Sequence, residues 1–268
     1  MTSRQKYRPF TGNVEGPAAL NKPPLAAVLC QVSWPKLSKF RSRFEEAVTH
    51  FGDGLKGYPI TSNEQEIAYR ISQEGKLTEE GDALYKWSSD TELWNITLGK
   101  RFLTFHSKEY EGFKNFIERF DPVLQNLYNV VDIPQIERIG MRYVNQITDQ
   151  EIVLNIDEMI QPEVLGLAEI KATAKEVGLL QSVNSAEWKV GTAEFAVKTG
   201  IVGPNRQVDP LIPTYDFHTW VMDIDASEIF QKRMEPSDII YNLGKLADIS
   251  VDFFRYMANE KFLKNFTE

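Results

Sequence analysis

The chain has 268 residues, of which 42% are hydrophobic and 25% are charged, so it can bury a full-sized core. Its formal net charge of −8 argues against sequence-independent binding to DNA, which needs many lysine and arginine contacts to phosphates. The apolar runs are far shorter than the roughly 20 residues that cross a bilayer. No secretory signal is predicted at the N-terminus, and one cysteine, Cys30, excludes a cysteine-rich metal site. We therefore expect a cytoplasmic protein without disulfides, with no membrane partner and a buried Cys30.

The first part of the chain predicts a strand, a helix, four strands and a second helix. Residues 1–24 are polar and rich in Gly, Pro and Asn, and are interpreted as a flexible arm or an extension of a sheet edge. A strand is predicted over 25–34, before Pro35, and an amphipathic helix over 37–51, where apolar residues are spaced by three and four. Strands are then predicted at 66–71, 83–88, 93–98 and 101–106, and a helix at 110–128 that contains Pro122.

The second part of the chain predicts a similar order of elements. A long strand at 136–147 is followed by a short helix near 151–160 and by strands at 167–174, 177–182 and 188–199. An exposed loop is predicted over 200–213, then a strand at 215–224 and a last helix that begins at Pro236.

The order strand–helix–four strands–helix can thus be read twice, in a first half at 25–133 and a second half at 134–268. This predicts an α+β fold in which two similar halves form an extended, curved antiparallel sheet with helices on one face. A single α+β domain without internal duplication is the alternative. In the duplicated arrangement, the opposite face of the sheet is free to hold a partner.

Three short motifs resemble those of an uncharacterised, sporadically distributed bacterial protein family of about this length. They are the opening at residues 23–35 (PPLAAVLCQVSWP), the mid-chain signature at 138–145 (RIGMRYVN), and the segment 220–225 (WVMDID) with the final Phe266-Thr267. The last helix of that family often carries a histidine after a leucine, whereas this chain has Leu246-Ala247-Asp248.

The resemblance implies no established activity. The patchy bacterial distribution of the family implies a setting in defence or toxin control, by association alone. The order of elements is separately similar to that of the TATA-binding-protein saddle.

The mid-chain signature contains the expected ligand-binding residues, Arg138, Arg142 and Asn145. Arg138, Gly140 and Arg142 alternate along one predicted strand and therefore face the same side of the sheet. Two guanidinium groups with a glycine between them can grip a phosphate or a carboxylate. The alternative is a cross-strand ion pair with Asp or Glu on a neighbouring strand.

Asp223 and Asp225 also alternate, and two carboxylates on one face could hold a divalent metal or act as an acid–base pair. A capping role at the end of a strand is favoured, because spacing identifies no third ligand. The three histidines, His50, His106 and His218, lie in separate elements without ligand spacing. No cofactor is therefore predicted.

No motif for nucleophilic catalysis or for phosphate binding is present, so an enzyme is not favoured. The five tryptophans fall on predicted strands, where packing under helices is favoured over base stacking. We expect a non-enzymatic binding protein (a sensor, adaptor or neutralising partner) that holds a protein partner on the open sheet face. The alternatives are nucleic-acid or nucleotide binding on that face, and a metal-dependent hydrolase or nuclease that uses Asp223 and Asp225. A homo-oligomer formed by edge pairing is a further possibility.

Overall fold

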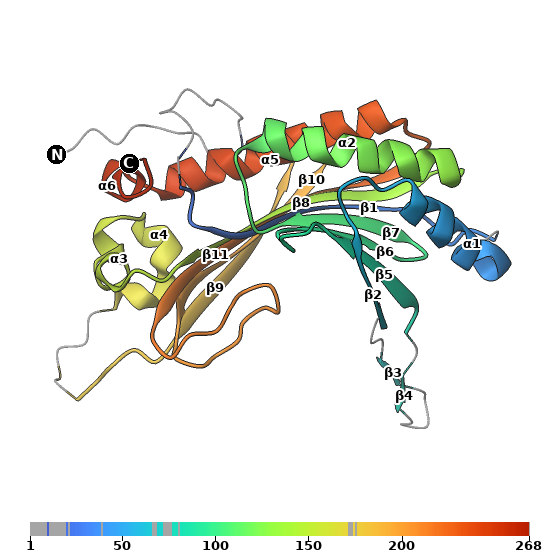
Figure 1. Cartoon of the computed structure of the whole chain (residues 1–268). Coiled ribbons are helices and arrows are strands. Elements are labelled where there is room, and N and C mark those ends of the chain that lie inside the picture. The colour runs from blue at the N-terminus through green and yellow to red at the C-terminus, as the bar shows by residue number, and fades with distance from the viewer. Residues whose placement is uncertain are drawn as a thin grey trace.

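The structure is a computed structural model that describes residues 10, 20, 22–38, 40–65, 69–71, 77–79, 81–170, 174 and 176–267. It confirms the α+β class, with one open antiparallel sheet of nine strands in the order β2-β5-β6-β7-β1-β8-β11-β10-β9 (Figure 1). Most of the arm predicted at 1–24 lies outside the described residues.

The first half contributes five strands to this sheet. β1 (Leu25–Ser33) lies at the centre, followed outward by β7 (Phe102–Ser107), β6 (Trp94–Leu98) and β5 (Ala83–Ser88), all within one residue of their predicted bounds. The strand predicted at 66–71 is not the fourth member. Its described part is β3 (Tyr69–Ile71), which pairs with β4 (Leu77–Glu79) in a separate sheet, and the outer strand is instead β2 (Ile60–Gln65).

The second half contributes β8 (Ile136–Ile147), as predicted, and then three strands in place of four. They are β9 (Ser182–Val190), β10 (Ala193–Val202) and β11 (Thr219–Lys232). Residues 166–169 form the short 3-10 helix η2 (Gly166–Glu169), and residues 177–181 form no strand; residues 171–173 lie outside the described residues. The strand predicted at 188–199 is divided at Gly191, whose φ of 63° suits the tight turn between β9 and β10.

Three helices cover one face of the sheet (Figure 1): α1 (Phe40–Asp53), α2 (Phe113–Val130) and α5 (Pro236–Met257). α2 buries five apolar residues at helical spacing, namely Phe116, Phe120, Val123, Leu124 and Leu127. The short helices α3 (Gln150–Leu154), η1 (Ile156–Glu158), α4 (Pro162–Leu165) and α6 (Glu260–Lys264) lie together at one end (Figure 1). In the part of the chain that the structure describes, none of the helices combines the length and apolar character needed to cross a membrane.

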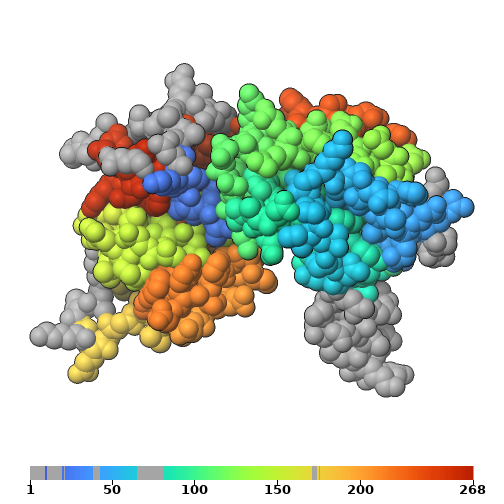
Figure 2. Space-filling view, in the orientation of Figure 1, coloured from blue at the N-terminus to red at the C-terminus, as the bar shows by residue number. Residues whose placement is uncertain are grey.

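One hydrophobic core runs under these helices through both halves, from Trp87 and Phe105 to Phe195 and Trp220. A much smaller apolar cluster lies on the opposite, concave face, where Val208 and Ile212 of the loop 203–218 pack on Ala27, Val144 and Val221. Figure 2 shows this underside hollowed between the orange loop and the blue-to-cyan first half. Within the part of the chain that the structure describes, the helices and this loop therefore leave the concave face of the first half uncovered.

Candidate functional site

Arg138 and Arg142 both lie on the concave face of β8, as their alternation predicts, and both are engaged by carboxylates. Arg142 Nε and Nη2 donate to the two carboxylate oxygens of Asp223 on β11, each at 2.7 Å, and Nη2 also donates to Asp209 Oδ2 at 2.6 Å. Arg138 Nη2 lies 3.5 Å from the Asp225 carboxylate. The cross-strand ion pair that was the alternative interpretation of these arginines is therefore present for both.

The three residues Asp209, Arg142 and Asp223 form one partly buried network. Their side chains are 19%, 20% and 10% exposed, in that order. The two carboxylates raise the pKa of the Arg142 guanidinium above its usual value, so it stays charged. Because Asp209 belongs to the loop 203–218, the network fastens that loop to the sheet.

Asp223 and Asp225 face the same side of β11, as predicted, but the arginines hold both of them. Burial raises the pKa of the Asp225 carboxyl, and the charges of Arg138 and Arg142 oppose that rise. Among the described residues, no group of three or more His, Cys, Asp or Glu side chains is placed to hold a metal ion. The geometry of these aspartates is that of structural ion pairs.

The concave face of the first half carries half-buried, uncharged side chains that can form hydrogen bonds, and these alternate with the buried residues of β1, β5, β6 and β7. They are Gln31, Ser88, Asn95, Thr97, Thr104 and His106. The half-buried apolar side chains of Leu29, Leu84 and Phe102 lie on the same face. Gln31 Nε2 donates to Thr104 Oγ1 at 3.2 Å across the strands. Lys86, on the same face, pairs with Glu64 of β2 at 2.5 Å, so this surface carries little net charge.

The three histidines do not converge. His50 is exposed on α1, and His218 precedes β11 at the other end of the molecule. His106 lies on the concave face, where burial first, and then the charges of Lys108 and Lys86, lower its pKa to about 4. It is therefore neutral at ordinary pH.

Asn145, the third expected ligand-binding residue, lies on the opposite face from the two arginines. An odd spacing separates it from Arg138 and Arg142 along β8, so its side chain points toward α5. It is 2% exposed, and its Nδ2 donates to the Met222 carbonyl at 3.1 Å. The structure therefore does not bring the three residues into one site.

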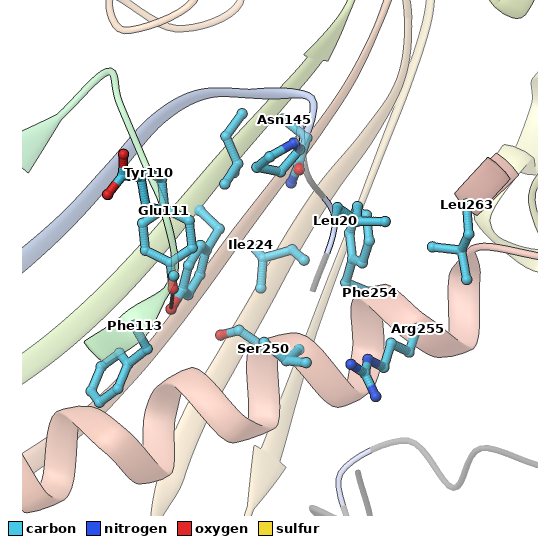
Figure 3. A pocket seen from close by; sticks show the side chains of 15 residues that line it. Leu20, Tyr110, Glu111, Phe113, Asn145, Ile224, Ser250, Phe254, Arg255 and Leu263 are labelled. Carbon is cyan, nitrogen blue, oxygen red and sulfur yellow. Dashed lines mark hydrogen bonds between the residues drawn. The ribbon is translucent and has the colours of Figure 1, made fainter. Parts of the chain in front are cut away.

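Asn145 instead lines a cavity of about 290 Å³ between the sheet, α5 and the start of α2 (Figure 3). The hydroxyls of Tyr110 and Tyr143 lie 3.3 Å apart in its wall, and Ser250 Oγ donates to the Leu246 carbonyl. Burial raises the pKa of both tyrosines, so both hydroxyls are protonated at ordinary pH. Neither tyrosine was predicted as a site residue, although alternation along the mid-chain signature put Tyr143 and Asn145 on one face of the strand.

Four of the five tryptophans are buried under the helices, as favoured, and Trp188 is 39% exposed. Trp188 stands on β9, where its ring packs against Phe10, Phe195 and Phe253. Cys30 is fully buried, and burial raises the pKa of its thiol, so it is a core residue. The five tryptophans therefore belong to the helix-covered side of the sheet.

Comparison of the chain with protein-family models, with curated proteins and with solved structures found no match. Its function therefore has to be inferred from the geometry and chemistry of the two faces of the sheet.

Proposed function

We propose that this protein is a non-enzymatic binding protein that holds a protein partner against the concave face of its sheet. The observation that carries the proposal is the chemistry of that face in the first half. It presents amides and hydroxyls from neighbouring strands, and Lys86 on this face is paired with Glu64. Such a neutral surface suits the polar backbone and side chains of a polypeptide.

Nucleic-acid or nucleotide binding is the weaker alternative. Phosphates need cations that are free to bind them, whereas Arg142 is already held by two carboxylates and Arg138 lies beside a third. A hydrolase that uses Asp223 and Asp225 is weaker still, because a metal or a substrate would have to displace Arg142 from its bidentate pair.

The family resemblance supports a cellular setting for the proposal. The protein would act as a sensor, adaptor or neutralising partner in a bacterial defence or toxin-control module, in the cytoplasm. The partner in that setting is another protein of the module.

Site-specific photocrosslinking tests the proposal. A photoreactive phenylalanine derivative at Thr97 probes the concave face, and the same group at Lys114, which is 91% exposed on α2, is the control. In cells of the source organism, position 97 is expected to give one discrete protein adduct that persists at high salt and after nuclease treatment. The absence of such an adduct, equal labelling from position 114, or crosslinked nucleic acid at position 97 would refute it.

A further inference from the structure

β9 is the last strand of the sheet and has an accessible outer edge (Figure 1). It pairs with β10 along all nine of its residues, and no described residue forms a hydrogen bond with the backbone groups on its other side. The run 185–189 is exposed at every position, on both faces of the strand. β9 contains no proline and no bulge. It therefore lacks two features that keep the edge strands of natural proteins from pairing with other chains.

The start of β9 is less accessible than the rest of the strand. Asn184 Nδ2 donates to the Leu165 carbonyl at the end of α4, and a Cβ atom on Gly166 of η2 would overlap the Asn184 side chain. These short helices therefore lie against the first residues of β9. A second strand has room beyond them, from residue 185 to the turn at Gly191.

The charges of β9 are arranged symmetrically about Trp188. Glu187 and Lys189 are both exposed on the concave side of the strand, and neither forms an ion pair with a described residue. Trp188 lies between them on the helix-covered side and is 39% exposed. Suppose that a second copy of β9 runs antiparallel to the first, with the two Trp188 residues opposite each other. Glu187 of each chain then stands opposite Lys189 of the partner subunit, with Cβ atoms about 4.5–5.5 Å apart.

Other symmetric registers of two β9 strands are less favourable. A two-fold axis at Glu187 or at Lys189 would place like charges directly opposite each other, which is destabilising. An axis at Ala186 would place Ser185 and Val183 opposite the two charged residues, and it would use the covered start of the strand. The axis at Trp188 is therefore the register that both the charges and the accessible backbone favour.

We infer that two copies of this chain form a two-fold symmetric dimer through β9, with Trp188 at the axis and two ion pairs between Glu187 and Lys189. The pairing continues the antiparallel sheet from one subunit into the next and brings the exposed parts of the two indole rings together. The opposite edge strand, β2, does not offer such a contact, because its one charged residue, Glu64, is already paired with Lys86. A contact of this length is small, so the dimer is expected to dissociate reversibly on dilution.

The dimer is independent of the proposed function. β9 is at one end of the sheet, whereas the proposed partner site lies on β5, β6, β7 and β1 toward the other end. A chain that stays monomeric could still hold a partner on that site, and a chain without such a partner could still dimerise. The two proposals can therefore fail separately.

Sedimentation equilibrium of the full chain over a wide range of concentrations tests the inference. The natural protein is expected to pass from monomer to dimer as its concentration rises. Glu187→Lys and Lys189→Glu each replace two attractive cross-strand pairs by two repulsive ones, so each should weaken dimerisation at least about tenfold. Lys114→Glu is the control, because Lys114 is 91% exposed on α2, and it should leave dimerisation unchanged.

An equimolar mixture of the Glu187→Lys and Lys189→Glu variants provides a second, sharper measurement. In a mixed dimer the two lysines of one chain face the two glutamates of the other, so the mixture should associate about as tightly as the natural protein. Such recovery would also show that both variants are folded. A natural protein that is monomeric at every concentration, unweakened single variants, or a mixture without recovery would overturn the inference.

Discussion

Arg142 and Asp223 lie diagonally across β8 and β11 and form a bidentate pair, with both N–O distances at 2.7 Å. The pair is largely screened from water, because the Asp223 side chain is only 10% exposed. Asp209 approaches the same guanidinium from the loop 203–218. One arginine therefore joins two strands and a loop on the concave face.

Arg142→Met should destabilise the protein by about 3 kcal/mol, because it leaves Asp223 and Asp209 as two close carboxylates without a cation. Urea denaturation followed by circular dichroism measures the loss. Arg101→Met is the control, since Arg101 is 56% exposed and pairs with Glu137 at the surface, where such a pair contributes less than about 1 kcal/mol. Equal losses in the two variants would show that burial does not strengthen the Arg142 network.

Asp209→Asn should loosen the loop 203–218 while the strand pair between Arg142 and Asp223 remains. Arg206 is exposed within this loop and offers trypsin a cleavage site. We expect cleavage after Arg206 to accelerate on the order of tenfold, since the free energy needed to open the loop locally becomes smaller. Mass spectrometry of timed digests measures the rate. The exposed Asp216 lies on the same loop, and Asp216→Asn should leave the rate unchanged; acceleration in both variants would argue against a fastening role for Asp209.

His106 should make the protein less stable in mild acid. Its pKa is about 4 in the folded protein and about 6.5 in the unfolded chain. Below pH 6.5 the unfolded state binds a proton that the folded state does not, so stability falls as the pH drops from 6.5 to 4 and levels off below 4. The loss from this residue is at most about 3 kcal/mol.

His106→Gln should flatten that part of the stability profile, measured by denaturant titrations at several pH values. His50→Gln is the control, because His50 is exposed on α1. A slope between pH 6.5 and 4 that is the same in His106→Gln as in the natural protein would exclude His106 as its source.

Gly200→Ala should separate β9 from β10. Gly200 has a φ of 154°, and a Cβ atom at this position would overlap the backbone carbonyl of Ser182 on β9. Because a backbone carbonyl cannot move aside as a flexible side chain can, we expect a loss of about 2–4 kcal/mol. Hydrogen exchange of the β9 amides should accelerate most. A Cβ at Gly178 meets nothing within 4 Å, so Gly178→Ala should leave exchange in β9 unchanged.

The strongly alternating strands could be predicted from the sequence, and the weak ones could not. β8 was predicted at its observed bounds because Ile139, Met141 and Tyr143 alternate in its middle and apolar residues stand at both of its ends. β2, with the sequence ITSNEQ, has almost no apolar signal, since it is an edge strand exposed to water. The strand predicted at 188–199 joined the end of β9 to most of β10 across the turn at Gly191, because apolar residues continue on both sides of that turn.

The candidate sites were only partly predictable. Alternation placed Arg138 and Arg142 on one face, but Asp209 and Asp223 reach Arg142 from 67 and 81 residues away in the chain. Local spacing carries no signal for contacts of that range. The cavity was missed for the same reason, since Tyr110, Tyr143 and Ser250 come from three distant parts of the chain: the connection before α2, β8 and α5.

The central place of β1 has a consequence for synthesis of the chain. β1 has β7 on one side and β8 on the other, and the ribosome completes β7 and α2 before it reaches β8. During that interval the nascent chain presents the N–H and C=O groups of β1 as a bare edge, which is a template for other chains. We therefore expect a polypeptide that stops after α2 to aggregate. Once β8 has been synthesised it pairs with β1, and this pairing removes the exposed edge.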